Sequence, residues 1–205
     1  MKKIFVTGIS TDVGKTIASA IITEALQADY WKPVQAGDLD NSDSIKVKKL
    51  ISNPKTVIHP NSYALHTPMS PHAAAEIDGV TIALPAIKEP VTKNHLVIEG
   101  AGGLLVPLNS EHTIMDIIQP DYRVIVVSRH YLGSINHTLL TLKYLQDAGI
   151  EPVVLFSGDE HPTTESIIAK MGKVPFLGRI TNEPYFDRNV VKEYADTLRD
   201  KLQAL

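Results

Sequence analysis

The 205-residue sequence contains no cysteine, and this absence excludes several kinds of site at once. Without thiols the chain can form no disulfide, no thiolate metal centre and no cysteine nucleophile. Its eight histidines show none of the close spacings that hold transition metals, so we interpret them as surface or hydrogen-bonding residues. The absence of cysteine therefore also removes one rival family of enzymes from the alternatives.

Long apolar runs and an excess of one charge are also missing. No window approaches the ~18 consecutive apolar residues that a membrane span requires. An apolar strand pattern begins within three residues of Met1, so we expect no signal peptide and a cytoplasmic protein. The net charge of −3 is ordinary for a globular protein and predicts neither a nucleic-acid-binding nor a membrane-binding surface.

Apolar segments alternate with helical patterns along the chain. Near-continuous Val, Ile and Leu runs predict parallel strands that are buried on both faces, at 2–8, 30–34, 95–100, 123–128, 152–157 and 174–180. Apolar residues spaced for one helix face predict helices over 15–28, 135–148 (closed by Gly149), 163–171 (closed by Gly172) and 188–202. We expect one α/β domain over 1–205, with a mostly parallel, doubly wound sheet covered by helices on both faces.

One segment does not fit this alternation. Residues 59–79 carry three prolines and no strand period. A stretch of this length is too long for a passive connection, so we predict a functional loop there.

The segment "TGISTDVGKT" (7–16) follows the first strand and opens the first helix, which is the context of a phosphate-binding P-loop. Gly14 lets the backbone approach phosphate oxygens, Lys15 offers an ammonium to the β- and γ-phosphates, and Thr16 can place its hydroxyl on Mg²⁺. Five residues separate Gly8 from Gly14, one more than the usual four. We predict a nucleotide site on residues 12–17, namely Asp12, Val13, Gly14, Lys15, Thr16 and Ile17.

Acidic residues can complete such a site with Mg²⁺. Glu99 ends a buried strand, where a carboxylate faces the ligand crevice at the carboxyl edge of a parallel sheet. The "GAGG" that follows would let Gly100, Ala101 and Gly102 approach the nucleotide, although an ordinary turn is an equal alternative. Asp43 is the second acidic candidate, with Asp38 and Asp40 as competitors, and its place at a helix start fits an N-cap equally well.

Lys32 ends a short and otherwise apolar strand pattern. An unpaired ammonium is costly to bury there, so we expect Lys32 to meet a phosphate or a carboxylate. The alternative is a lysine at the edge that reaches solvent along its own stem.

Together these segments resemble one family, the dethiobiotin synthetases, which are ATP-dependent carboxylases of the penultimate step of biotin synthesis. The resemblance covers nearly the whole chain. It is carried in order by "VTGISTDVGKT" (6–16), "KPVQAG" (32–37), "NSDS" (41–44), "HTPMSPHAAA" (66–75), "VIEGAGGLLVPL" (97–108) and "LGSINHTLLT" (132–141). The P-loop alone occurs in many enzymes, whereas the combination is highly specific.

The resemblance implies a reaction of 7,8-diaminononanoate, CO₂ (or bicarbonate) and MgATP that yields dethiobiotin, ADP and phosphate through a carbamate and a carbamic-phosphoric anhydride. It implies Lys15 and Lys32 as the catalytic cations, with Lys32 stabilising the carbamate and the developing phosphate charge. It also implies that Thr16, Asp43 and Glu99 hold Mg²⁺. For Asp43, the resemblance favours the metal over the N-cap.

The resemblance further implies a homodimer with the substrate at the subunit interface, where a tyrosine of the second subunit can reach the substrate carboxylate. The substrate-binding residues that it implies are Thr11, Lys32, Ala36, Ser134, Ile135 and Asn136. No tyrosine of this sequence can be matched to the one from the second subunit.

Three positions depart from the family pattern. Ala36 stands where a Ser or Thr is usual, so a hydroxyl contact to the substrate is missing. Gly158 stands where an Asn often reads adenine, and Thr181 replaces the proline of an Ile-Pro pair, so the nucleobase preference is open.

Other classes of protein share parts of this pattern. A partitioning or septum-positioning ATPase would carry a signature lysine where this chain has Ser10, and a basic membrane helix at its C-terminus. An amidoligase would need a glutaminase domain, for which the chain is too short, so only a free-standing synthetase would remain. A former synthetase that only binds nucleotide is a third alternative, which the presence of Lys15, Lys32 and Glu99 disfavours.

Overall fold

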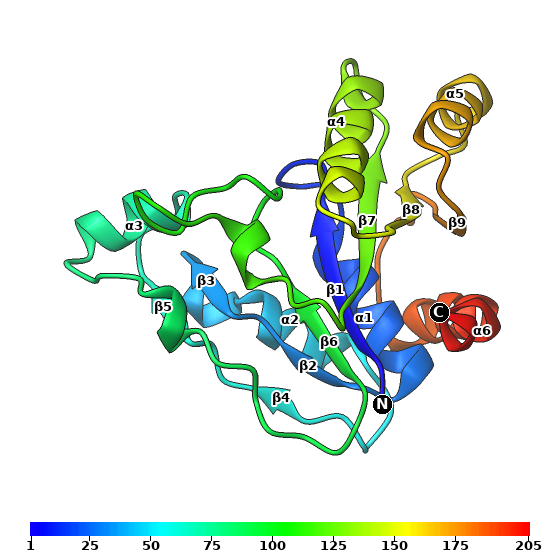
Figure 1. Cartoon of the computed structure of the whole chain (residues 1–205). Coiled ribbons are helices and arrows are strands. Elements are labelled where there is room, and N and C mark those ends of the chain that lie inside the picture. The colour runs from blue at the N-terminus through cyan, green and yellow to red at the C-terminus, as the bar shows by residue number, and fades with distance from the viewer.

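A computed structural model describes residues 1–205 (Figure 1). Nine strands are present: β1 (Lys3–Gly8), β2 (Asp29–Trp31), β3 (Val34–Ala36), β4 (Ile58–His59), β5 (Tyr63–Leu65), β6 (Leu96–Glu99), β7 (Arg123–Arg129), β8 (Val153–Ser157) and β9 (Phe176–Ile180). The six α-helices are α1 (Lys15–Leu26), α2 (Asp43–Leu50), α3 (Pro71–Ile77), α4 (Ser134–Asp147), α5 (Pro162–Gly172) and α6 (Arg188–Ala204). Short 3₁₀ turns cover Leu39–Asn41, Leu84–Ala86 and Ile114–Ile117.

Seven strands form one parallel sheet in the order β4-β2-β6-β1-β7-β8-β9. The central strand β1 pairs with β6 on one side and β7 on the other, and Phe5 lies opposite both Ile98 and Val124. The chain winds outward from β1 in both directions, which leaves a crevice at the carboxyl ends of β1, β6 and β7. The P-loop, Glu99 and the segment before α4 all leave the sheet at this edge.

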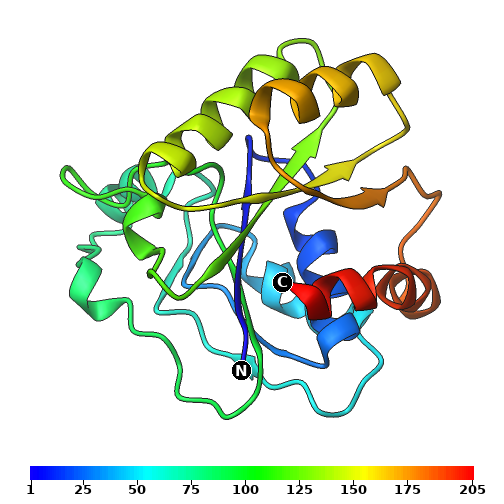
Figure 2. The same ribbon diagram turned by 45° about the vertical axis from the view of Figure 1, so that its right-hand side comes forward.

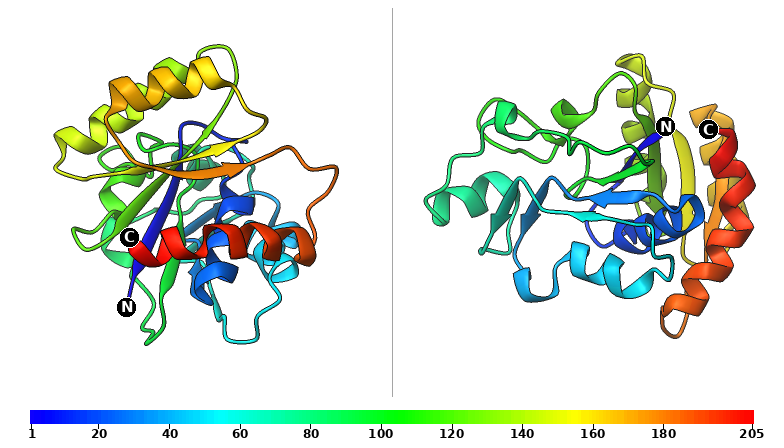
Figure 3. Two further views of the ribbon diagram at one scale, coloured as in Figure 1. Left: turned by 90° about the vertical axis from the view of Figure 1, so that its right-hand side faces the viewer. Right: turned by 90° about the horizontal axis from the view of Figure 1, so that it is seen from below.

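Helices cover both faces of the sheet, as the apolar pattern predicts. Figures 2 and 3 show α4 and α5 together on one face, with α1, α2 and α6 on the other. Helix α1 packs mainly against α6, and α4 packs against α5. A continuous hydrophobic cluster of 46 buried residues fills the space between these layers. The predicted doubly wound α/β architecture is confirmed.

The strand predicted over 30–34 is wrong in its extent. Pro33 has no backbone N–H, and the chain leaves the main sheet at Trp31. Residues 34–36 then form β3, which pairs in parallel with β5 as a separate two-stranded sheet. The residues around Lys32 therefore connect two sheets, and Lys32 itself belongs to neither.

The segment 59–79 also has more regular structure than the sequence predicts. It contains β5 and helix α3, which begins with Pro71 directly after Ser70. Proline is favoured at the first position of a helix, and Ala73 to Ala75 are good helix formers, so α3 follows ordinary rules that the prolines obscured. Figure 1 shows α3 and β5 projecting beyond the main sheet.

The two predicted glycine caps have different outcomes. Gly149 has a φ of +76° directly after α4, as predicted. Gly172 instead lies inside α5, and Lys173 takes the left-handed conformation with a φ of +51°. A Cβ on Gly172 would lie 2.7 Å from Leu142 Cδ1, so this glycine allows α5 to pack closely on α4. None of the helices combines the length and apolar composition that crossing a bilayer requires.

Candidate nucleotide and substrate site

The P-loop connects β1 to α1 through a backbone that only some residues can adopt. Asp12 and Gly14 have φ angles of +54° and +94°. A Cβ on Gly14 would lie 2.8 Å from Ser157 Oγ, so glycine is required there by both conformation and space. Val13 is buried in the core and anchors the loop. The amides at the start of α1 can therefore face a phosphate group.

Lys15 is the first residue of α1, and its side chain is almost fully buried. Its ammonium donates a hydrogen bond to the Ser10 carbonyl at 2.9 Å. Burial lowers the pKa of Lys15 to about 8; Glu99 opposes this shift, and the ammonium of Lys32 adds to it. Lys15 is thus a buried cation that needs an anionic partner. The phosphates of a nucleotide would supply that partner.

Glu99 ends β6 and is only 1% exposed. Its Oε1 accepts hydrogen bonds from Thr16 Oγ1 at 2.9 Å and from Lys32 Nζ at 3.2 Å. Its Oε2 accepts from the hydroxyl of Tyr30 at 2.8 Å. Burial raises the pKa of Tyr30 well above its usual value, so this phenol is protonated and donates. Both oxygens of the Glu99 carboxylate therefore accept hydrogen bonds from buried side chains.

Lys32 lies between two carboxylates, as its burial requires. Its ammonium pairs with Glu99 and also with Asp43. Burial alone would lower the pKa of Lys32, but the two carboxylates raise it above the ordinary value. For Asp43 the directions are reversed: burial alone would raise its pKa, but the neighbouring ammonium of Lys32 lowers it below the ordinary value. The expectation that Lys32 meets an anion is confirmed for the carboxylates.

The structure also decides which residue caps α2. Ser42 is the N-cap, and its Oγ accepts a hydrogen bond from the Ile45 amide at 3.4 Å. The carboxylate of Asp43 is therefore free of the capping role and points to Lys32 and Lys46. Asp38, one of the competing acidic residues, pairs with Lys46 at 2.9 Å.

The oxygen donors at this point suit Mg²⁺. Thr16, Asp43 and Glu99 offer a hydroxyl and two carboxylates, which are the hard ligands that Mg²⁺ prefers. No group of three or more His, Cys, Asp or Glu side chains gathers anywhere in the chain. Mg²⁺ commonly needs only one or two carboxylates because nucleotide phosphates and water fill its other positions. The residues therefore fit a magnesium ion that arrives with a nucleotide.

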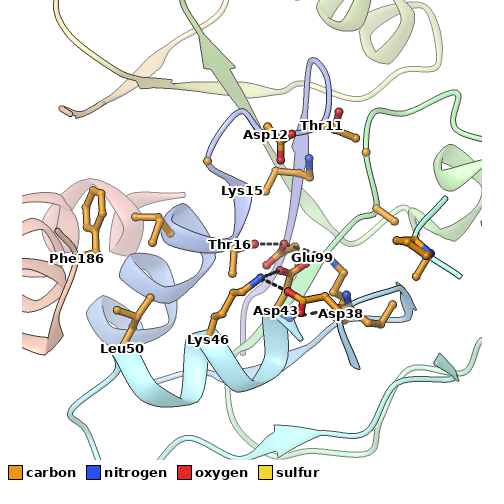
Figure 4. Close-up of a pocket in the computed structure, with 18 of the residues that line it drawn as sticks. Thr11, Asp12, Lys15, Thr16, Asp38, Asp43, Lys46, Leu50, Glu99 and Phe186 are labelled. Carbon is orange, nitrogen blue, oxygen red and sulfur yellow. Dashed lines mark hydrogen bonds and ion pairs between the residues drawn. The ribbon is translucent and has the colours of Figure 1, made fainter. Parts of the chain in front are cut away.

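A large cavity of about 1590 Å³ opens over these groups (Figure 4). It brings together most of the predicted site residues: Thr11, Asp12, Gly14, Lys15, Thr16, Ile17, Lys32, Ala36, Asp43, Glu99, Ala101 and Gly102. Two predicted nucleotide-binding residues do not line it. Val13 is buried in the core, and a Cβ on Gly100 would lie 3.2 Å from Ile114 and 3.3 Å from Phe5.

The cavity extends in two directions from the P-loop. One end is lined by Ile17, Leu50 and Phe186, and Figure 4 shows Leu50 and Phe186 well apart from Asp38 on the other side of Thr16. The other end is lined by residues 68–71, just before α3. In Figure 1, α6 and α3 lie on opposite sides of β1, so the two ends of the cavity lie on different sides of the P-loop.

Near α3 the chain after β3 and the chain after β5 come into close contact beside the cavity. Gly37 follows Ala36 with a φ of +72°, and its amide donates to the Leu65 carbonyl at 2.8 Å. A Cβ on Gly37 would lie 2.5 Å from Pro68 Cβ and 2.6 Å from its Cα. The half-buried Ala36 and the exposed Pro68 both line the cavity beside this contact.

Sequence reasoning missed several residues of the cavity. Arg129 lines it and donates from Nη1 to the Asp12 carbonyl at 3.2 Å. Arg129 ends β7, which is the neighbour of β1 in the sheet. Polar residues at the carboxyl ends of parallel strands face the ligand crevice, and this rule, which identified Glu99, could also have identified Arg129. Lys46 and residues 186–189 also line the cavity, and their short polar patterns gave no comparable signal.

The predicted substrate residues Ser134, Ile135 and Asn136 do not line the cavity. They form the first turn of α4 on the opposite face of the sheet from α1. Ser134 is buried, and its amide donates to the Tyr131 carbonyl at 2.9 Å. Ile135 and Asn136 are exposed. Within one chain these residues and Lys32 are therefore not brought together.

Near Gly158, where the resemblance leads us to expect an adenine-reading Asn, a carboxamide approaches from another segment. Apart from atoms of the adjoining residues, only the two carboxamide atoms of Asn182 lie within 4 Å of the point where a Cβ on Gly158 would be, both at 3.9 Å. Neither Gly158 nor Asn182 lines the cavity. Asn182 Nδ2 donates to Asp159 Oδ2 at 3.0 Å, which orients the amide. Asn182 follows the Ile180-Thr181 pair that also departs from the family pattern.

Comparisons with known proteins agree with this geometry. The model of the AAA domain family matches residues 2–190. The ATP-dependent dethiobiotin synthetase BioD of Christiangramia forsetii is 62% identical over 98% of both chains, and that of Cytophaga hutchinsonii is 50% identical over 98% of both. The corresponding protein of Rhodopseudomonas palustris is 45% identical over 93% of this chain and 92% of its own.

Solved structures show the same fold at low sequence identity. The MinC:MinD cell division protein complex of Aquifex aeolicus matches with a TM-score of 0.61 at 15% identity, covering 100% of this chain and 97% of that chain. The MinD cell division protein of the same organism has a TM-score of 0.57 at 12% identity, with 98% and 97% covered. These matches identify a P-loop NTPase fold, while identity along nearly the full length shows that the chain belongs to the ATP-dependent dethiobiotin synthetase family.

Proposed function

We propose that this chain catalyses the ATP-dependent closure of a cyclic urea on 7,8-diaminononanoate with CO₂, which gives dethiobiotin, ADP and phosphate. The observation that carries the proposal is the buried ammonium of Lys32. It lies against Asp43 and Glu99 beside a P-loop, in a chain 62% identical to a dethiobiotin synthetase.

The proposed reaction proceeds in three balanced steps. One amine of the substrate adds to the carbon of CO₂ and loses a proton, which gives a carbamate. A carbamate oxygen then attacks the γ-phosphorus of ATP and displaces ADP. Finally the second amine attacks the carbonyl carbon, loses a proton to the departing phosphate and expels it, which closes the ring. Such chemistry depends mainly on positioning and on stabilising negative charge.

The cations of the site suit these needs. Lys15 at the start of α1 would bind the β- and γ-phosphates. Lys32 would neutralise the carbamate and the charge that grows on the transferred phosphoryl group. Thr16, Asp43 and Glu99 would hold Mg²⁺, which supplies further neutralisation of the phosphate oxygens when bound. The end of the cavity beside Ile17, Leu50 and Phe186 would take the nucleoside, and the end beside residues 68–71 the diamine.

The proposal includes a homodimer that shares its sites. Asn136, Leu140 and Tyr144 lie at helical spacing on one exposed stripe of α4. Leu140 is 61% exposed, and the neighbouring Leu132 is fully exposed. Such an apolar surface favours association with another chain. A second copy that covered this stripe could bring Ile135 and Asn136 to the diamine end of its partner's cavity.

The proposal treats residues 1–205 as one synthetase domain, since one hydrophobic cluster joins all the layers of the fold. Because its co-substrate ATP is made and used in the cytoplasm, the proposed location is cytoplasmic.

The direct test is phosphate release from purified protein with MgATP and bicarbonate, with and without 7,8-diaminononanoate. We expect release that depends on the diamine and matches the dethiobiotin formed. The same assay with CTP and GTP measures the nucleobase preference. Release that is indifferent to the diamine would refute the proposed acceptor.

A further inference from the structure

Tyr30 is a fully buried residue of β2 that lies beneath the candidate site without lining its cavity. In the parallel pairing of β2 with β6, Tyr30 lies opposite Val97. Side chains two residues apart on a strand share a face, so Glu99 lies on the same face as Val97 and diagonal to Tyr30. This register brings the phenol hydroxyl to Glu99 Oε2 at 2.8 Å.

The two oxygens of Glu99 have different environments. Oε1 faces the reactive groups and accepts hydrogen bonds from Thr16 and Lys32. Oε2 is bound only by Tyr30. A carboxylate that is 1% exposed cannot turn to water for a replacement donor. The phenol therefore fixes which oxygen of Glu99 faces the cavity and at what angle.

We propose that Tyr30 is a positioning residue for the phosphoryl-transfer site, because its hydroxyl holds Glu99 in the orientation that Thr16, Lys32 and the nucleotide-bound metal need. This inference rests on the proposed function, and it adds a residue that acts only through Glu99. Without the hydroxyl, Oε2 is left buried without a donor, and the carboxylate is free to rotate toward Lys32. Such a rotation would weaken the metal site and change the pairing of the Lys32 ammonium.

A purely structural role is the competing explanation, and the chain contains a second buried tyrosine that serves as a control for it. Tyr122 is also buried, and its hydroxyl donates to Glu89 Oε2 at 2.7 Å. It precedes β7 at the amino end of the strand, whereas Glu99 lies at the carboxyl end of β6. Tyr122→Phe therefore removes a tyrosine–glutamate hydrogen bond away from the site, and Glu89, whose side chain is 26% exposed, can accept from water in its place.

The experiment compares wild type, Tyr30→Phe and Tyr122→Phe by urea unfolding, by calorimetric ATP binding with and without Mg²⁺, and by turnover. We expect both variants to lose some stability. Mg²⁺ is expected to increase ATP affinity about tenfold less, or less still, in Tyr30→Phe than in wild type, and kcat is expected to fall by a similar factor. Residues that hold metal ligands in place commonly have effects of this size. Tyr122→Phe is expected to show neither loss. The KM for the diamine is expected to stay within about twofold, because Tyr30 does not line the cavity.

A third variant, with 4-aminophenylalanine at residue 30, restores an N–H donor on an almost identical ring. Recovery of the Mg²⁺-dependent affinity in this variant would support the role of the donor, even if Tyr30→Phe is too unstable for turnover measurements. Equal effects of Tyr30→Phe and Tyr122→Phe, in an active wild-type enzyme, would overturn the positioning role alone. A wild type that makes no dethiobiotin would overturn the proposed function and this inference with it.

Discussion

A buried ammonium is costly unless anions or other acceptors surround it, and Lys32 has two carboxylates within reach. Lys32→Gln should lower kcat about 100- to 1000-fold, because the group that we propose to neutralise charge in the transition state is removed. The affinity for MgATP should change little, since Lys15 and the P-loop amides remain. Steady-state kinetics together with calorimetric ATP binding measures both quantities.

Lys46 provides the control for this prediction. It also approaches Asp43, at 3.7 Å, but it is more exposed and does not contact Glu99. Lys46→Gln should therefore reduce kcat far less than Lys32→Gln. If the two substitutions had equal effects, Lys32 would act only as a general cation of the cavity.

Asn182 offers a second prediction at the scale of one residue. Its carboxamide lies near Gly158, the position where the family resemblance leads us to expect an adenine-reading Asn. Asn182→Ala should raise the KM for ATP and reduce the preference for ATP over CTP and GTP, with kcat at saturation almost unchanged. Competition assays between the nucleotides measure this preference. An unchanged nucleotide preference would show that the base is bound elsewhere. Asn189→Ala, which changes an Asn that lines the cavity, is measured in the same assays for comparison.

Among the elements, α5 and β9 are joined by a buried ion pair. Arg179 of β9 and Glu165 of α5 form a bidentate pair, and His130 after β7 adds a contact to Glu165 at 2.8 Å. Burial alone would raise the pKa of Glu165. The hydrogen bonds from Arg179, the His161 amide and His130 outweigh burial and lower this pKa to about 2.

The sign of the resulting pH dependence follows from this lowered pKa. The pair stabilises the fold above the ordinary glutamate pKa of 4.5, and this stabilisation is lost as the pH falls toward 2. Glu165→Gln should lower the free energy of unfolding at pH 7 by about 3 kcal/mol, and by much less near pH 2. Urea unfolding across this range measures the difference. The exposed Glu111→Gln should show no such trend, and a loss that is constant with pH would contradict the argument.

Secondary structure was predictable where one local rule dominates. The long apolar runs of β1 and β7 and the helical spacing of α1 are visible without the fold. The pair β3 and β5 was not predictable, because each strand has only three residues and is stabilised by the other. The prediction that Gly172 ends its helix was wrong for a similar reason, because the role of this glycine is set by its contact with Leu142 on another helix.

The candidate site was predictable to the same extent. Lys15, Thr16 and Glu99 follow from strand-end and P-loop rules. The sequence left Asp43 open between two roles, and the capping bond of Ser42 removed one of them. Tyr30 gave no signal, because a tyrosine in a strand is ordinary until the register places it against Glu99.

For the whole molecule, the sharing of sites between subunits can be tested by mixing two inactive variants. Lys32→Gln inactivates the cavity of its own subunit. Asn136→Asp inactivates the end of α4 that would reach the partner's cavity, because it would place a negative charge near the substrate carboxylate. In a mixed dimer, one site would combine an intact Lys32 with an intact Asn136. Refolding the two together should restore about a quarter of wild-type activity, because half of the dimers are mixed and each has one good site.

Size-exclusion chromatography of each variant shows whether it still forms dimers. Mixed samples without recovered activity, although dimers form, would mean that each site is complete within one subunit. Recovery at the expected level would identify Asn136 as a residue that acts across the interface.

The contact between Gly37 and Pro68 sets a limit on how this sequence can change during evolution. With backbone atoms this close, even alanine at residue 37 would act as a wedge between β3 and the segment before α3. The width of this end of the cavity, where we propose that the diamine binds, thus depends on a residue that has no side-chain functional group. Directed evolution toward longer or shorter diamines would therefore have to proceed through neighbours such as Ala36 and Met69, while residue 37 stays glycine.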